Sequence, residues 1–191
     1  MTARQQFDPL NDRLSRDIRN RLSVAFAEAL AEGTMAQVEE VAARSRASGL
    51  APVYEAYIAD RLIRYQEALR TIATNGVEEP LTRALLLWDL GLFFEVHEIL
   101  EQAWRRAHGP EKAILQAMIR AAGMYIKLAM GQPEAARKMA TKALAALERH
   151  RALAGTKLPL NRLLAALKSV DPNPPKLYRI PTEPNDHAAT L

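Results

Sequence analysis

The sequence contains no cysteine, only eight glycines among 191 residues, and few aromatic side chains, 6% of the total. Without cysteine the chain can form neither disulfides nor thiolate sites, which excludes zinc fingers and iron–sulfur clusters. It also lacks an uninterrupted apolar run, because the longest one, residues 113–130, is broken by Gln116, Arg120 and Lys127. A lipid-facing span would not tolerate these side chains, so this stretch predicts a buried helix rather than a membrane segment.

The start of the chain, MTARQQFDPLND, is polar and has no apolar segment typical of a signal peptide. Together with the absence of cysteine, this favours a cytoplasmic protein. The net charge is +4, and the main basic cluster alternates with aspartates, which favours a solvated helix surface over nucleic-acid binding. The cluster comprises Arg13, Arg16, Arg19 and Arg21, interleaved with Asp12 and Asp17. We expect a small molecule or a protein as partner. The sequence is also compatible with a homo-oligomer, and it identifies no cofactor.

Proline and glycine divide the chain into runs with helical periodicity, and alternation typical of strands is missing. Prolines that suit a first helical turn stand at Pro9, Pro52, Pro80, Pro110, Pro133 and Pro159. The sequence therefore predicts an all-α fold, a compact bundle of antiparallel helix hairpins with about eight helices. The expected helices span about 9–32, 34–48, 52–74, 80–90, 93–108, 111–130, 133–153 and 159–170.

Composition separates a proline-rich tail at 171–191 from the helical runs before it. Five of the 11 prolines lie in the tail, which predicts an extended segment outside the main core. Three large apolar residues could anchor the tail, namely Leu177, Tyr178 and Ile180.

The most unusual segment is GLFFEVHEILEQAW, residues 91–104. On a helical wheel one face is apolar, formed by Val96, Ile99, Leu100, Ala103, Trp104 and Ala107. The polar residues away from that face are expected to be solvated, namely Glu95, Glu98, Gln102, Arg105 and Arg106. His97 and Glu101 lie at the edge of the apolar face, one helical turn apart, where the rim of a pocket would be.

A histidine and a glutamate at this spacing can hydrogen-bond each other, share a divalent metal with other groups, or act as an acid/base pair. The segment HEILE matches the zinc-protease helix HExxH poorly, because Glu101 stands where the second histidine must be. The Glu-x-x-His pairs of di-iron bundles are also missing. We therefore expect no metal, with His97 buried against Glu101 and Trp104 as a structural pair. His97 and Glu101 are the candidate ligands if a metal is present, and a small-ligand site and catalysis remain alternatives.

The expected helix at 111–130 is apolar nearly all round, which predicts a central position. Its polar stripe, Gln116, Arg120 and Lys127 with Gly123 between them, either reaches solvent or faces His97 and Glu101. In the second case Arg120 would neutralise Glu101. The candidate ligand-binding residues are Glu95, His97, Glu98, Glu101, Trp104, Gln116 and Arg120. Catalytic residues cannot be named from the sequence.

From about Ala84 to His150 the chain resembles the uncharacterised family numbered 309 among the domains of unknown function. The residues that carry the resemblance are Gly91, Phe93, Phe94, Glu95, His97, Glu98, Leu100, Glu101, Trp104, Leu115, Gln116, Gly131, Ala135 and Ala136. Where the family usually has a glutamine near the middle of the second helix, this chain has Arg120, so no role is carried over for that position. The resemblance implies an all-helical, family-like core at 81–170 and no particular activity. Residues 1–80 lie outside the resemblance, so we expect them to be an N-terminal helical extension that packs on this core.

These observations predict a helical bundle protein with a small-ligand site around His97 and Glu101. One alternative is a helical scaffold that presents a groove to a protein or RNA partner. Another is a hydrolase that uses the same site, so the sequence leaves open whether the protein is an enzyme.

Overall fold

The computed structural model describes residues 6–47 and 49–179, and these residues form nine helices and no strand. The helices are α1 (Arg13–Glu32), α2 (Ala36–Arg46), α3 (Pro52–Asn75), α4 (Pro80–Asp89), α5 (Phe93–Arg106), α6 (Gly109–Ala129), α7 (Pro133–Arg149), α8 (Arg151–Lys157) and α9 (Leu160–Ser169). The predicted all-α fold is confirmed.

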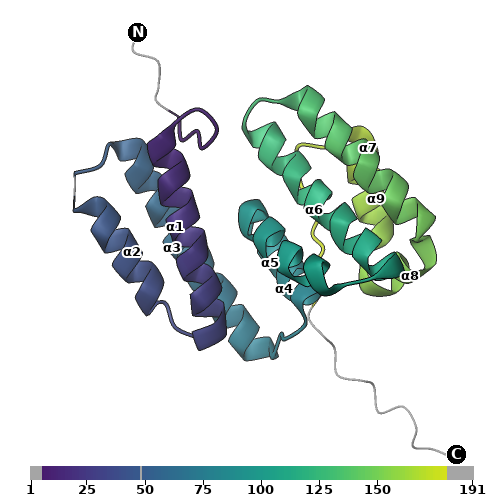
Figure 1. Ribbon diagram of the computed structural model, residues 1–191, viewed down its shortest axis with the longest axis horizontal. Helices are drawn as coiled ribbons and strands as arrows, with labels where there is room; N and C mark the ends of the chain where they lie inside the picture. Colours follow the sequence, from purple (N-terminus) through teal and green to yellow (C-terminus); the bar gives the residue numbers. More distant parts are fainter. Residues whose placement is uncertain (1–5, 48, 180–191) are drawn as a thin grey trace, which may run out of the picture.

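The helices form two groups in space (Figure 1). Helices α1, α2 and α3 make up one group and α4 to α9 the other, and α1 contacts α5 where the groups meet. Within the second group α6 packs against α5 and against α7. Its residues Ile114, Met118 and Met124 are at most 1% exposed, so α6 has the central position that its sequence predicts. In the residues that the structure describes, every helix is too short or too polar to span a bilayer.

The first helix starts later than its proline suggests. The sequence predicts a start at Pro9, but α1 begins at Arg13. The carboxylate of Asp12 caps the helix by accepting hydrogen bonds from the backbone N–H groups of Leu14 (3.2 Å) and Ser15 (2.9 Å). An aspartate side chain that accepts hydrogen bonds from two N–H groups of the first turn is a stronger signal for a helix start than a proline, which only lacks an N–H group of its own.

The predicted helix at 133–153 is two helices, because α7 ends at Arg149 and α8 follows at a new angle after His150. His150 has φ −110° and ψ 31°, outside the helical range. The new direction lets Ala154 of α8 become fully buried. No proline or glycine marks this break in the sequence, so tertiary packing explains it and local propensity does not.

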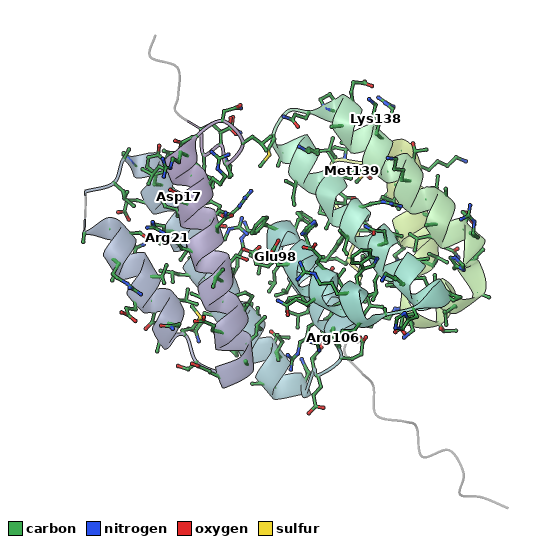
Figure 2. All side chains as sticks on the ribbon, viewed as in Figure 1. Asp17, Arg21, Glu98, Arg106, Lys138 and Met139 are labelled. Carbon is green, nitrogen blue, oxygen red and sulfur yellow. The ribbon has the colours of Figure 1, made fainter. Side chains whose placement is uncertain are left out.

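Close contact between α6 and α7 depends on Gly123. A Cβ atom at this position would lie 2.8 Å from Sδ of Met139 on α7, which Figure 2 labels. A glycine inside a helix costs about 1 kcal/mol against alanine, and here the close helix contact offsets that cost. Of the two explanations that the sequence offers for Gly123, helix approach or room for a ligand, the structure supports the first.

The aromatic part of the core surrounds Trp88 of α4, which is fully buried. The rings of Phe93 and Tyr125 meet it edge-on, each with its centroid 5.1 Å away. Trp88 Nε1 donates a hydrogen bond of 2.9 Å to the carbonyl oxygen of Pro175. The chain after α9 is therefore tied to the centre of the second group.

The same segment docks on the end of α4. The backbone N–H groups of Leu177 and Tyr178 donate to the carboxylate of Asp89 at 2.7 and 3.2 Å. Leu177 is 1% exposed and Tyr178 is half-buried, whereas Ile180 lies outside the described residues. The prediction that the tail lies outside the main core is therefore wrong for residues up to Leu177. The physical reason is that Leu177 is buried and anchors the tail, as its apolar side chain suggested.

Candidate functional site

The segment at 91–104 forms α5, and an arginine of α3 fixes its start. Gly91 has φ +71°, and a Cβ atom there would lie 2.6 Å from Nη1 of Arg64. The same Nη1 donates a hydrogen bond of 2.7 Å to the carbonyl oxygen of Leu90 at the end of α4. The N-terminal helices therefore help to set the direction in which α5 leaves the turn.

Glu95, on the first turn of α5, is buried, with 2% of its surface exposed. Its Oε1 accepts a hydrogen bond of 2.5 Å from the hydroxyl of Tyr65 on α3. The prediction that Glu95 is solvated is therefore wrong. A helical wheel assumes one buried face, but α5 is covered by α6 along its apolar face and by the side chain of Tyr65 at Glu95.

Arg61 of α3 completes this buried cluster. Its Nη1 lies 3.8 Å from Glu95 Oε2, and its side chain is 16% exposed. Among the described residues, neither Arg61 Nε nor Glu95 Oε2 has a hydrogen-bond partner. Burial acts to lower the pKa of Arg61, but Tyr57 and Glu95 outweigh it, so this pKa is raised. Burial, followed by the Glu95 charge, raises the pKa of Tyr65 well above its ordinary value, so Tyr65 remains a neutral donor.

His97, Glu98 and Glu101 form a second group on the same helix. Each offers one ligand atom, and these atoms all lie within 4.8 Å of one another. The side chains are 36%, 45% and 37% exposed, in that order. His97 Nδ1 lies 3.2 Å from Glu98 Oε1, while Glu101 pairs with Arg105 at 3.4 Å. The expectation of a buried His97–Glu101 pair is therefore wrong, because the adjacent Glu98 offers His97 a nearer acceptor.

The electrostatics of this group favour an ionised carboxylate at Glu98. The hydrogen bond with His97 lowers the pKa of Glu98, burial opposes that shift, and Arg19 and Arg105 add to it. Arg19 lies on α1, with its guanidinium carbon 3.9 Å from the ring centroid of Phe94. Glu98 is therefore an anion held beside α1, and in Figure 2 it lies between α1 and α5.

A groove of about 400 Å³ runs between α1 and α5 beside this group. Glu98 and Gln102 of α5 line one side, and the α1 side has small side chains such as Ser23 and Ala27 together with Glu28. Gln102 and Ala27 also line the next hollow along the two helices, of about 250 Å³. The half-buried histidine–glutamate group therefore adjoins, through Glu98, a groove that Glu28 and Glu98 make acidic.

The other predicted site residues lie elsewhere. Trp104 is half-buried, with Lys112 Nζ 4.5 Å from its ring centroid. Gln116 and Arg120 are half-buried on α6, and within the described residues neither has a hydrogen bond or ion pair to the histidine–glutamate group. The suggested neutralisation of Glu101 by Arg120 is wrong, because Arg105 on the same helix takes that place.

Sequence reasoning missed the partners that α1 and α3 supply. Tyr65 lies 30 residues before Glu95, and Arg61 and Arg19 lie still further away along the chain. Nothing local in the sequence links them to α5. The one available signal for a buried carboxylate was the position of Glu95 in an apolar helix start. Its burial becomes clear only when the position of α3 in the fold is known.

Residues 81–139 match a family model described as a domain of unknown function (DUF309). The match confirms the resemblance noted from the sequence and covers α4, α5, α6 and the first part of α7. Glu95 and the histidine–glutamate group lie inside the matched segment, whereas Arg19, Arg61 and Tyr65 lie before it. No curated protein and no solved structure matches the chain.

Proposed function

We propose that His97, Glu98 and Glu101 bind a divalent metal ion of the zinc type, and that this ion is the centre of a small-ligand site at the rim of the α1–α5 groove. The observation that carries the proposal is the grouping of one imidazole nitrogen and two carboxylate oxygens within 4.8 Å of one another. Zinc prefers nitrogen and carboxylate oxygen ligands. The sequence favoured no metal because it matches neither the HExxH nor the di-iron motif and because it suggested a buried His97–Glu101 pair. The half-buried grouping of three ligand atoms speaks against the second of these reasons.

The geometry suits an open site. Tetrahedral coordination with bonds of about 2.1 Å places ligand atoms roughly 3.4 Å apart, so the half-buried glutamate side chains need to move by little more than about an ångström. Three protein ligands leave a fourth position for water or an organic ligand. That position would face solvent and the groove that Glu98 lines.

One of the surrounding charges favours metal binding, and another opposes it. Glu28 adds negative charge on the α1 side of the groove, which favours a cation. Arg105 holds Glu101 at 3.4 Å and must release it when the metal binds. Because imidazole and carboxylate groups bind a metal only in their deprotonated forms, binding also becomes weaker at acidic pH.

Isothermal titration of the untagged protein with zinc chloride tests the proposal. We expect saturable binding that His97→Ala and Glu101→Gln each weaken by about tenfold or more, since each variant removes one ligand. Arg105→Ala should bind more tightly than the wild type, because the competing cation is gone. His108→Ala is the matched control, since His108 is an exposed histidine outside the group.

Two results would overturn the proposal. One is the absence of saturable binding in the wild type. The other is binding that survives unchanged in both His97→Ala and Glu101→Gln, because the metal would then occupy a different place.

A further inference from the structure

We infer that a depression at the corner of α8 and α9 binds a small phosphate-bearing molecule, independently of the proposed metal site. The depression has a volume of about 500 Å³ and is lined by the arginines Arg151, Arg162 and Arg179. No aspartate or glutamate is among its lining residues in the described part of the chain. Figure 1 places α8 and α9 on the far side of the second helix group from α1.

Two of the three arginines are free to bind a ligand. Arg151 is held in place, since it donates to Glu148 Oε2 at 2.7 Å and to Asn161 Oδ1 at 2.8 Å. Within residues 6–47 and 49–179, the guanidinium groups of Arg162 and Arg179 have neither an ion pair nor a hydrogen bond, and both residues are exposed. Glu148 offsets Arg151, so the depression has a surplus of about two positive charges from Arg162 and Arg179.

The start of α9 adds to this positive field. Pro159 occupies the N-cap position of this ten-residue helix and no side chain caps it. The backbone N–H groups of Leu160 and Arg162 already donate to the carbonyl oxygens of Leu158 and Pro159, so this helix end contributes its dipole, which favours an anion. The arginine guanidinium groups match the oxygens of a phosphoryl group.

An adjoining hollow of about 250 Å³ shares Arg179, Gly155 and Pro159 with the depression. Tyr178 and Thr82 also line it. The Tyr178 hydroxyl is buried without a hydrogen-bond partner among the described residues, which is costly for a phenol. This hollow has room for the organic part of a ligand whose phosphate the arginines hold.

The shape of the site favours a small molecule over a nucleic-acid strand. The positive charges gather around one hollow of pocket size, whereas strand binding needs a stripe of them along a surface. Lys157, at the edge of the adjoining hollow, is engaged with Glu111 at 3.8 Å and does not extend the charge.

Titration of the full chain with inorganic pyrophosphate at constant ionic strength tests this inference. We expect binding that Arg162→Gln and Arg179→Gln each weaken by about tenfold, the loss of one charge-assisted contact. Arg16→Gln is the control, because Arg16 is an exposed arginine on α1. Circular dichroism should show unchanged folding in all three variants, since the substituted residues are exposed.

A parallel titration with a short single-stranded oligonucleotide separates the two kinds of phosphate ligand. The inference is overturned if pyrophosphate does not bind, or if both arginine variants bind it as the wild type does. It is also overturned if the oligonucleotide binds more tightly than pyrophosphate and loses affinity in the same variants, because the site would then serve a nucleic acid.

Discussion

Glu95 and Glu98 lie one turn apart on α5 and inside the same matched segment, but their surroundings differ completely. Glu95 is 2% exposed and accepts a hydrogen bond from Tyr65, whereas the Glu98 side chain is 45% exposed beside His97. The first joins α5 to the N-terminal helices, and the second faces a groove. One acidic helix thus combines a structural carboxylate with a proposed ligand-binding group.

The two helix groups are linked by the buried Glu95 in the same way that α5 is linked to α3. α3 supplies Tyr65 and Arg61 to a residue of the matched segment, so the N-terminal helices do more than cover it. A buried carboxylate is unfavourable unless hydrogen bonds and charge compensate it. We infer that this segment, in this chain, depends on α3 for its stability.

Replacing Glu95 should have the largest effect. Glu95→Ala leaves the buried Tyr65 hydroxyl without its acceptor and removes the carboxylate that lies 3.8 Å from Arg61 Nη1, which should cost about 3–5 kcal/mol in the free energy of unfolding. Glu98→Ala should cost less than about 1 kcal/mol, because Glu98 is half exposed. Urea denaturation followed by circular dichroism measures both. Equal losses in the two variants would contradict the division between buried and exposed carboxylates.

Removing the tail anchor should have the next largest effect. Leu177→Ala takes a side chain out of a packed core position and should cost about 2–4 kcal/mol, which the same denaturation experiment measures. Asn173→Ala, an exposed tail residue, is the control and should stay within about 0.5 kcal/mol. A loss below that limit for Leu177→Ala would show that the tail does not contribute to the core.

Tyr65→Phe should have a smaller effect than either. It removes one hydroxyl but keeps the ring that stacks on Phe26 with centroids 4.0 Å apart. The expected loss is about 1–3 kcal/mol, because Glu95 then lacks its hydrogen-bond donor. If Tyr65→Phe is as stable as the wild type, the hydrogen bond to Glu95 does not hold the two helix groups together.

His97→Ala should have the smallest effect on stability in metal-free buffer. His97 contacts Glu98 on its own helix and is about one-third exposed, so its loss should change the free energy of unfolding by about 0.5 kcal/mol or less. The control is His108→Ala, and thermal unfolding in chelator-treated buffer compares the two. A loss of several kcal/mol would mean that His97 is a structural residue after all.

Much of the fold follows from local rules that the sequence displays. Pro52, Pro80 and Pro133 each begin a helix as expected. Helix α6 is central because it is apolar nearly all round and has only a narrow polar stripe. The break at His150 could not be predicted, since no residue type there disfavours a helix. The break results from the packing of α8 against α6, α7 and α9, which the local sequence does not reveal.

The sequence singled out the helix that carries the histidine–glutamate group but not the pairings within that group. Three polar residues of the segment at 91–104 come together in the structure, and their role as a binding site stays a prediction. The wheel could not identify Glu95 as buried, because Tyr65 comes from a helix 30 residues away in the chain. The wheel favoured Glu101 as the partner of His97, because residues four apart lie on the same side of a helix, whereas the structure pairs His97 with the adjacent Glu98.

The most direct test of this account is urea unfolding of the wild type, Glu95→Gln and His97→Ala, each with and without zinc chloride. At a hundredfold excess of zinc over its dissociation constant, binding should stabilise the wild type by about 2.7 kcal/mol. Glu95→Gln should start from a lower stability and gain the same increment, whereas His97→Ala should start near the wild type and gain nothing. The account is contradicted if zinc stabilises His97→Ala as much as the wild type, or if Glu95→Gln loses the zinc increment.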